Sequence, residues 1–199
     1  MPSDRPMPIA PMPYEDFTPA MLKASHAREE GAGRAWIGLL GKTGPMAELF
    51  LPFYLSLVED ENILGYKLTE LVRLAIATTT GCEACLGYRD PRALEQGMDP
   101  NVIGLFDELE RADFSPRERA AIRYALTFCT NHHRVDDALL GELKSLFTDQ
   151  EIMTLGLYVA AFLGAGRLAH VMRVIDSHCT LPGYRLASLV EAKDRHEVG

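Results

Sequence analysis

The chain has 199 residues, 47% of them hydrophobic, and a formal net charge of −8 at pH 7. This length and apolar content suit one domain with a sizeable core, and the scattered basic residues exclude a nucleic-acid surface, which needs clustered Lys and Arg. No apolar run reaches the ~18–20 residues of a membrane span, the N-terminus lacks an export signal, and four cysteines are too few for a secreted disulfide framework. We therefore expect a cytoplasmic protein with no membrane or nucleic-acid partner.

The N-terminal segment differs in composition from the rest of the chain. Six of the twelve prolines lie within residues 1–19, and proline removes amide donors and disfavours helix. We expect an extended arm, which Tyr14 and Phe17 could anchor on the domain or on a neighbouring subunit, with a disordered tail as the alternative. The expected organisation is an arm over 1–19, a single all-helical domain over 20–183 with its core at about 45–176, and a tail over 184–199.

Helix start signals recur along the rest of the chain, and no stretch alternates with period two, so we predict an all-α fold without a sheet. Thr18-Pro19 places a cap before a first-turn proline, and Ser115 to Glu118 and Thr148 to Glu151 are capping boxes. Pro52 should break or kink its helix. The expected helices span about 19–30, 35–40, 45–57, 67–79, 82–96 with an interruption at Asp90-Pro91, 100–109, 115–129, 136–147 and 148–176.

The helix from Lys67 to Thr79 is the predicted centre of the fold. Its apolar residues cover most of its circumference, as in a buried helix, and Gly81 ends it. The last helix is also apolar on nearly every side from Leu155 to Leu163, and then turns small over 164–166. Such a surface needs burial, and small residues let helices approach closely, which favours an oligomer.

Cys82 and Cys85 form a C-x-x-C pair. One turn of helix brings two such sulfurs within bonding reach. Amides at a helix start would stabilise a thiolate at Cys82, and the neighbouring thiol could then close a disulfide. Two inert buried cysteines are the plain alternative. A zinc site would need two further ligands. No second C-x-x-C is present; the other cysteines and histidines available are Cys129, His132, His133, His178 and Cys179.

Glu70 lies among apolar residues at the start of the central helix. Partial burial would raise its pKa and suit it to proton transfer, whereas a glutamate facing water is the plain alternative. Cys82 lies twelve positions after it, so a contact requires the chain to fold back after Gly81.

A glutamate is followed, after eleven residues, by Cys-x-x-Cys, within the segments ELVRLAIA and GCEACL. In these segments the chain resembles the alkylhydroperoxidase D-like branch of the carboxymuconolactone decarboxylase family. The resemblance extends to GMDPNVI, SPRERAAIRYALTF and DQEIMTLGLYVAAFLGAGRLAH. It implies an all-helical, alkylhydroperoxidase D-like bundle that forms a homotrimer or homohexamer. It also implies a thiol-dependent peroxidase or disulfide reductase. Carried over, Glu70 matches the family's acid, and Cys82 and Cys85 match its redox pair.

Two positions depart from the family pattern. A histidine four residues after the second cysteine relays protons in the family, and Arg89 stands there; a histidine between the cysteines is replaced by Ala84. Arginine stays charged and cannot pass a proton at neutral pH, but it can stabilise a thiolate or pair with Glu70. We therefore predict catalytic thiols with an altered proton relay. The resemblance favours Cys85 as the attacking cysteine, and helix-start electrostatics favour the first cysteine.

Three further residues are weaker substrate-binding candidates. Tyr88 could donate a hydrogen bond, although packing is its default role. His132 and His170 could contact substrate, although an exposed loop residue and a core or interface residue are their respective defaults. The expected partners are a small peroxide or disulfide substrate and an unidentified thiol reductant. No cofactor or metal is expected, since no nucleotide-binding fingerprint is present.

Two other functions stay open. The first is a cofactor-independent lyase like the decarboxylase branch, with Arg73 and Arg89 binding substrate carboxylates and His132 or His170 moving protons. Members of that branch generally lack the cysteine pair, which counts against this reading. The second is a non-catalytic helical oligomer with a residual site.

Overall fold

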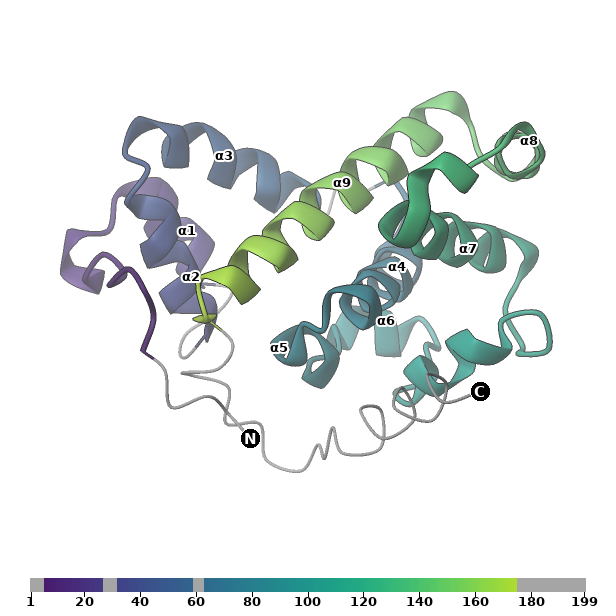
Figure 1. The fold of residues 1–199 in the computed structure, drawn as a ribbon, viewed down its shortest axis with the longest axis horizontal. Coiled ribbons are helices and arrows are strands. Elements are labelled where there is room, and N and C mark those ends of the chain that lie inside the picture. The colour runs from purple at the N-terminus through teal and green to yellow at the C-terminus, as the bar shows by residue number, and fades with distance from the viewer. Residues whose placement is uncertain (1–5, 27–31, 59–62, 175–199) are drawn as a thin grey trace.

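The computed structural model describes residues 6–26, 32–58 and 63–174. Within these ranges every regular element is a helix and there is no strand, as predicted (Figure 1). In chain order the elements are η1 (Tyr14–Asp16), α1 (Pro19–His26), α2 (Ala32–Gly41), α3 (Pro45–Ser56), α4 (Tyr66–Thr80), α5 (Glu83–Gly87), α6 (Pro91–Glu95), η2 (Val102–Glu108), α7 (Pro116–Asn131), η3 (His132–Arg134), α8 (Asp137–Leu146) and α9 (Asp149–Val171).

The centre of the main core is α4, as predicted. It packs against α7 and α9, and α5, α6 and η2 lie against it as well. Leu71, Val72, Leu74 and Ala75 are fully buried. Burying a leucine or valine side chain contributes ~1.5–3 kcal/mol, so this helix anchors the elements around it, including the turn that carries the cysteines.

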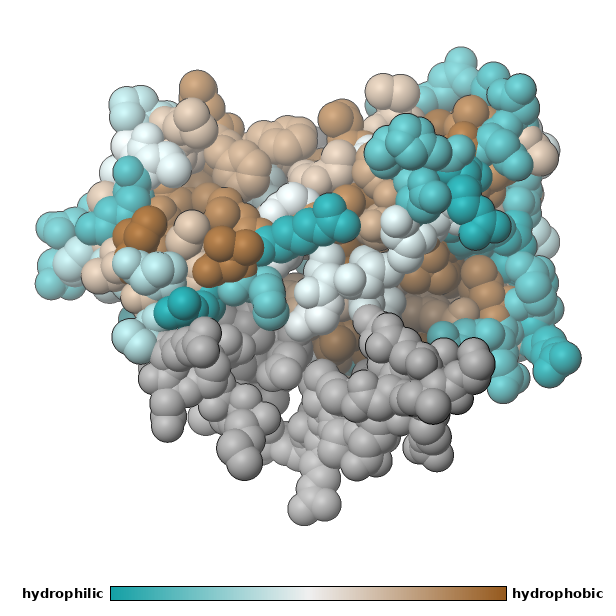
Figure 2. All heavy atoms as spheres, viewed as in Figure 1, coloured by the Kyte–Doolittle hydropathy of each residue, from teal (hydrophilic) through white to brown (hydrophobic). Residues whose placement is uncertain are grey.

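A second core joins α1, α2 and α3 to the end of α9. Its most buried large side chains include Met21 and Leu51, and Val174 also belongs to it. Figure 2 shows apolar side chains gathered over this part of the molecule, whereas hydrophilic ones dominate around α8. The N-terminal helices therefore form their own packed unit against the last helix.

The described part of the arm lies on this second core. Phe17 is buried in it, and the Met12 amide donates to the Gly38 carbonyl (2.9 Å). A Cβ at Gly38 would lie 2.8 Å from the Met12 carbonyl oxygen, so this close approach requires glycine. Arg173, just after α9, donates to the Pro6 carbonyl (3.0 Å). The described part of the arm therefore contacts its own chain at several points.

Most of the predicted helix boundaries are confirmed. Both capping boxes form, at Ser115 and at Thr148, and Asp90 and Asp136 cap α6 and α8. Gly81 ends α4 in the left-handed conformation, with φ of 65°. The tail expected over 184–199 lies outside the described residues.

Three expectations about helices are corrected. The helix α3 runs through Pro52 without a break; Pro52 and Glu48 are both exposed, so water can bind the carbonyl that proline leaves without a donor. The stretch after Pro100 is a 3-10 helix. The last helix ends at Val171, because Arg173 adopts a φ of 56° that no helix accommodates.

The composition of α9 also departs from expectation. An 18-residue stretch of it has a mean hydropathy of 1.6, long and apolar enough to cross a membrane by length and composition. The prediction that no such stretch exists was wrong. The prediction looked for an uninterrupted apolar run, whereas the mean hydropathy stays high although small and polar residues interrupt this helix. Only 22% of the stretch is buried. Its exposed large apolar side chains are Met153, Leu157, Leu168 and Val171.

Candidate functional site

The cysteine pair lies at the turn between α4 and α5. After Gly81 the chain turns back, and the Cys82 amide donates to the Ala77 carbonyl (3.2 Å). Cys82 is the residue that caps α5. The fold-back that the predicted site requires is therefore present, and it brings the segment after α5 alongside Glu70.

The two cysteines are joined by a disulfide, and their Cα atoms are 5.2 Å apart, within the usual range for such a bond. The Cys85 amide donates to Cys82 Sγ (3.3 Å), so a helix-start amide does point at this sulfur, as predicted. Cys82 is 3% exposed, whereas Cys85 is only half-buried. Solvent reaches the pair through Cys85.

Glu70 is buried, with 4% of its surface exposed. Its carboxylate accepts Arg73 Nε on Oε2 and Arg73 Nη2 on Oε1, both at 2.7 Å. Oε1 also accepts the Asp90 amide at 3.0 Å. Bidentate arginine–carboxylate pairs are the strong, directional form of this contact. The burial predicted for Glu70 is confirmed, but its partner is a residue that sequence reasoning proposed only as an anion anchor.

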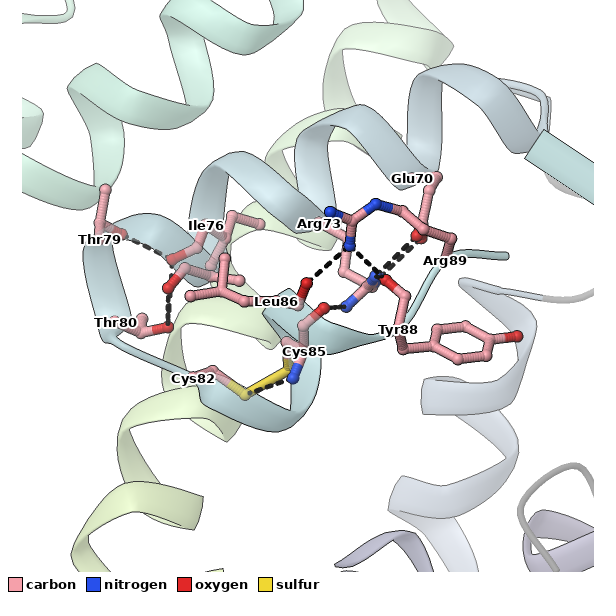
Figure 3. The surroundings of a disulfide bond; sticks show 11 residues. Glu70, Arg73, Ile76, Thr79, Thr80, Cys82, Cys85, Leu86, Tyr88 and Arg89 are labelled. Carbon is pink, nitrogen blue, oxygen red and sulfur yellow. Dashed lines mark hydrogen bonds and ion pairs between the residues drawn. A yellow bond between two sulfur atoms is a disulfide. The ribbon is translucent and has the colours of Figure 1, made fainter. Parts of the chain in front are cut away.

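Arg73 continues beyond Glu70 to the main chain of the cysteine turn. Nη1 donates to the Cys85 carbonyl (2.9 Å) and Nη2 to the Tyr88 carbonyl (3.0 Å). Figure 3 shows its guanidinium between Glu70 and the backbone of Cys85. Burial acts to lower the pKa of Arg73, but the hydrogen bond and charge of Glu70 outweigh it and raise the pKa. The three-residue spacing of Glu70 and Arg73 on one helix was the sequence signal that could have revealed the pair.

Arg89 also binds main-chain carbonyls. Its Nε donates to the Pro100 carbonyl (2.9 Å), and its Nη1 donates to those of Leu86 (2.7 Å) and Tyr88 (2.8 Å). The last carbonyls of a helix have no intrahelical donor. At the position where the family carries histidine, this chain therefore places a residue that holds the end of α5.

The weaker candidates lie apart from the cysteines. Tyr88 is 53% exposed, so it is not a core packing residue; its ring points away from the disulfide (Figure 3), and the Arg73 guanidinium carbon lies 5.6 Å from the ring centroid. His132 is exposed on η3 beside His133, as expected of a loop histidine, and His170 is exposed in the last turn of α9. The structure does not group these side chains on the α4–α5 turn, and their roles stay predictions.

The anion-anchor role considered for Arg73 meets an obstacle. All three of its guanidinium nitrogens already donate to Glu70 or to backbone carbonyls. A substrate carboxylate would have to displace these contacts, and displacing a buried charge from its partner is costly. This arrangement does not favour the lyase alternative.

No metal-binding group of side chains accompanies the pair in the described part of the chain. Within the described ranges, no three histidine, cysteine, aspartate or glutamate side chains gather as a metal-binding group, and His178 and Cys179 lie outside those ranges. A cavity of about 220 Å³ lies beside the start of α4. Its lining includes Lys67, Leu71 and Phe114, so it adjoins the main core away from the cysteine turn.

Comparisons with known sequences agree with these motifs. The sequence profile of the Carboxymuconolactone decarboxylase family matches residues 45–127. Uncharacterized proteins from two strains of Mycobacterium tuberculosis, CDC 1551 / Oshkosh and H37Rv, are each 32% identical over 162 residues, covering 74% of this chain and 54% of their own length. The chain thus spans about half the length of the curated relatives it matches.

Comparisons with solved structures agree with the fold. An uncharacterized peroxidase-related protein with an alkylhydroperoxidase AhpD core, from Ralstonia eutropha JMP134, superposes with a TM-score of 0.61 and 21% identity over 80% of this chain and 83% of its own. The debrominase Bmp8 superposes with a TM-score of 0.63 and 17% identity over 94% of this chain and 97% of its own. At these identities the likeness is one of fold.

Proposed function

We propose that this chain, whose residues 45–127 match the profile of the carboxymuconolactone decarboxylase family and whose fold is alkylhydroperoxidase D-like, is a thiol-dependent peroxidase or disulfide reductase of that family. In this proposal Cys82 and Cys85 cycle between dithiol and disulfide. The observation that supports it most is the disulfide at the start of α5, in which Cys82 is buried and Cys85 is only partly buried.

We assign the attack on peroxide to Cys85. Its thiolate attacks one peroxide oxygen, the O–O bond breaks, Cys85 becomes a sulfenic acid, and the other oxygen leaves as an alkoxide that takes a proton from water. The Cys82 thiol then displaces the sulfenic oxygen as water and closes the disulfide. An external thiol reductant restores the dithiol and is itself oxidised to a disulfide.

The difference in exposure between the cysteines supports this assignment. A peroxide or a reductant arriving from solvent meets Cys85 first, because Cys82 is 3% exposed. When a reductant attacks Cys85, the sulfur of Cys82 leaves as a thiolate. The Cys85 amide already donates to that sulfur, and a stabilised thiolate is a faster leaving group. A stabilised thiolate at Cys82 suits either an attacking or a leaving sulfur, so the difference in exposure is what assigns the attack to Cys85.

Thiol titration after a peroxide pulse tests the proposal. We expect two thiols per chain to disappear together, and we expect Cys82→Ser or Cys85→Ser to abolish the paired loss. Cys129→Ser is the matched control, because Cys129 is buried and burial raises the pKa of its thiol. If both thiols of the pair stay free and unreactive at neutral pH, the proposal is wrong. Turnover of a carboxylated lactone by the double serine variant would support the lyase instead.

We also propose that the protein assembles as a homotrimer or homohexamer in the cytoplasm. The support for assembly is the exposed apolar side of α9, which the rest of the described chain leaves uncovered, together with exposed apolar residues of α3. These are Met46, Leu49 and Phe53 on α3 and Met153, Leu157, Leu168 and Val171 on α9. Contiguous exposed apolar surface of this kind marks interaction sites.

A further inference from the structure

We propose that Arg73 is a positioning residue for the cysteine pair, and that through it Glu70 sets the equilibrium between dithiol and disulfide. The inference rests on the proposed thiol chemistry of Cys82 and Cys85. It assigns Glu70 a different part from the proton relay that the family resemblance implies. The acid acts on the cysteines through a fixed guanidinium.

The geometry of the guanidinium carries the inference. Nε and Nη2 donate to the Glu70 carboxylate. Nη1 donates to the Cys85 carbonyl at 2.9 Å, and Nη2 also donates to the Tyr88 carbonyl at 3.0 Å. The Arg73 side chain is 11% exposed. One buried side chain therefore connects α4 both to Cys85, inside α5, and to Tyr88, the residue that follows α5.

Glu70 fixes this guanidinium in turn. Its carboxylate accepts two hydrogen bonds from Arg73 and one from the Asp90 amide. Asp90 caps α6, so the Glu70 carboxylate binds the start of α6 directly and the end of α5 through Arg73. Figure 3 shows Glu70 and the disulfide on opposite sides of the Arg73 guanidinium.

The cysteine turn needs such support from outside. The helix α5 has five residues, far below the ~12–15 at which an isolated helix becomes even marginally stable. Its last carbonyls have no intrahelical donors, and Arg73 supplies one to Cys85. Without the Arg73 guanidinium, the turn would sample conformations in which the two sulfurs are further apart. The effective concentration of one thiol at the other would fall, and the disulfide would form less readily.

Lysine cannot replace arginine in this role. Arginine presents its donors in a rigid planar fork, whereas lysine is a point charge on a flexible stem. In Arg73→Lys the charge and a contact with Glu70 can survive, but a single nitrogen cannot reach two carboxylate oxygens and two carbonyls. The substitution therefore separates positioning from charge.

The test is the equilibrium of the full-length chain with glutathione buffers, read as the fraction of the Cys82–Cys85 pair in the disulfide form. We expect Arg73→Lys to lower the equilibrium constant for disulfide formation about tenfold, which is ~30 mV for a two-electron couple. Arg117→Lys is the matched control. Arg117 likewise pairs with a glutamate, Glu151 (2.5 Å), and donates to a carbonyl, that of Leu146 (2.7 Å), away from the cysteine turn.

An Arg73→Lys constant equal to that of the wild type or of Arg117→Lys overturns the inference, and so does a shift towards disulfide. If Arg73→Lys does not fold, Glu70→Gln replaces it. That variant weakens the contact between Glu70 and Arg73 from the side of Glu70 and should shift the equilibrium constant in the same direction by a smaller factor; no shift again overturns the inference.

No peroxide enters this measurement. A protein inert to peroxide but sensitive to Arg73→Lys refutes only the peroxidase proposal, and a peroxidase insensitive to it refutes only the positioning role.

Discussion

The helices α4 and α9 are both apolar around most of their circumference, but the described chain covers them very differently. The shorter α4, with 15 residues, has nine that are buried, whereas α9, with 23 residues, has four. Neighbouring helices surround α4, while one side of α9 carries exposed apolar residues. An apolar circumference therefore predicts that a helix must be covered, but it does not predict whether the cover comes from the same chain.

The largest effect should follow from a cavity in α4. Leu74 is fully buried, and Leu74→Ala should lower the free energy of unfolding by ~2–5 kcal/mol, because the transfer free energy is lost and a cavity remains. Urea unfolding followed by circular dichroism measures this. The same change at Leu157 should cost under ~1 kcal/mol in a monomer. An equal loss at both positions would mean that a second subunit covers α9 as tightly as the chain covers α4.

A charge on the exposed side of α9 should change assembly more than folding. Leu157→Glu should reduce the mass measured by light scattering from a trimer or hexamer towards a monomer, because a buried unpaired carboxylate is costly at an interface. Gln150→Glu adds the same charge at an exposed position in the first turn of α9 and should leave the mass unchanged. A monomeric mass for the wild-type protein at micromolar concentration would refute the proposed assembly.

The smallest effect concerns the ion pair at the start of α9, which is more exposed than the one on α4. The hydrogen bond from Arg117 lowers the pKa of Glu151 to about 2. Because the pKa is lower folded than unfolded, the stabilisation is present above the unfolded value of ~4.3 and is lost as the pH falls towards 2. Glu151→Gln keeps a residue suited to the capping box and should cost up to ~1 kcal/mol at pH 7.

Urea unfolding at several pH values checks this last prediction. The difference between wild type and Glu151→Gln should shrink between about pH 4 and pH 2, where the wild-type carboxylate takes up a proton. A difference that stays constant across this range would show that the variant acts through packing or capping instead of charge.

Most of the fold followed from local sequence signals. The capping boxes at Ser115 and Thr148 and the glycine stop at Gly81 depend on residues a few positions apart, so they can be read directly. The unbroken course of α3 through Pro52 and the end of α9 were not predicted, because they depend on solvent exposure and on the backbone of one residue, Arg173. Neither is encoded by a local pattern.

The candidate site was predictable in its residues but not in its contacts. Glu70, Cys82 and Cys85 could be chosen from spacing and resemblance. The roles of Arg73 and Arg89 could not, because each binds main-chain carbonyls in or just after α5. For Arg73 these lie up to fifteen residues away in the sequence. Every residue has a main-chain carbonyl, so the residue type of the acceptor does not indicate such a hydrogen bond, and a sequence pattern cannot predict it.

The hydrogen bond from Arg173 to the Pro6 carbonyl has a topological consequence. It ties the start of the arm to the residue that follows α9, 167 positions later in the sequence. The second core is thereby bordered by both segments, since Met7 and Met12 of the arm and Met172 and Val174 after α9 pack in it. A change that loosens the arm should therefore also loosen the end of α9, although the two are far apart in the sequence.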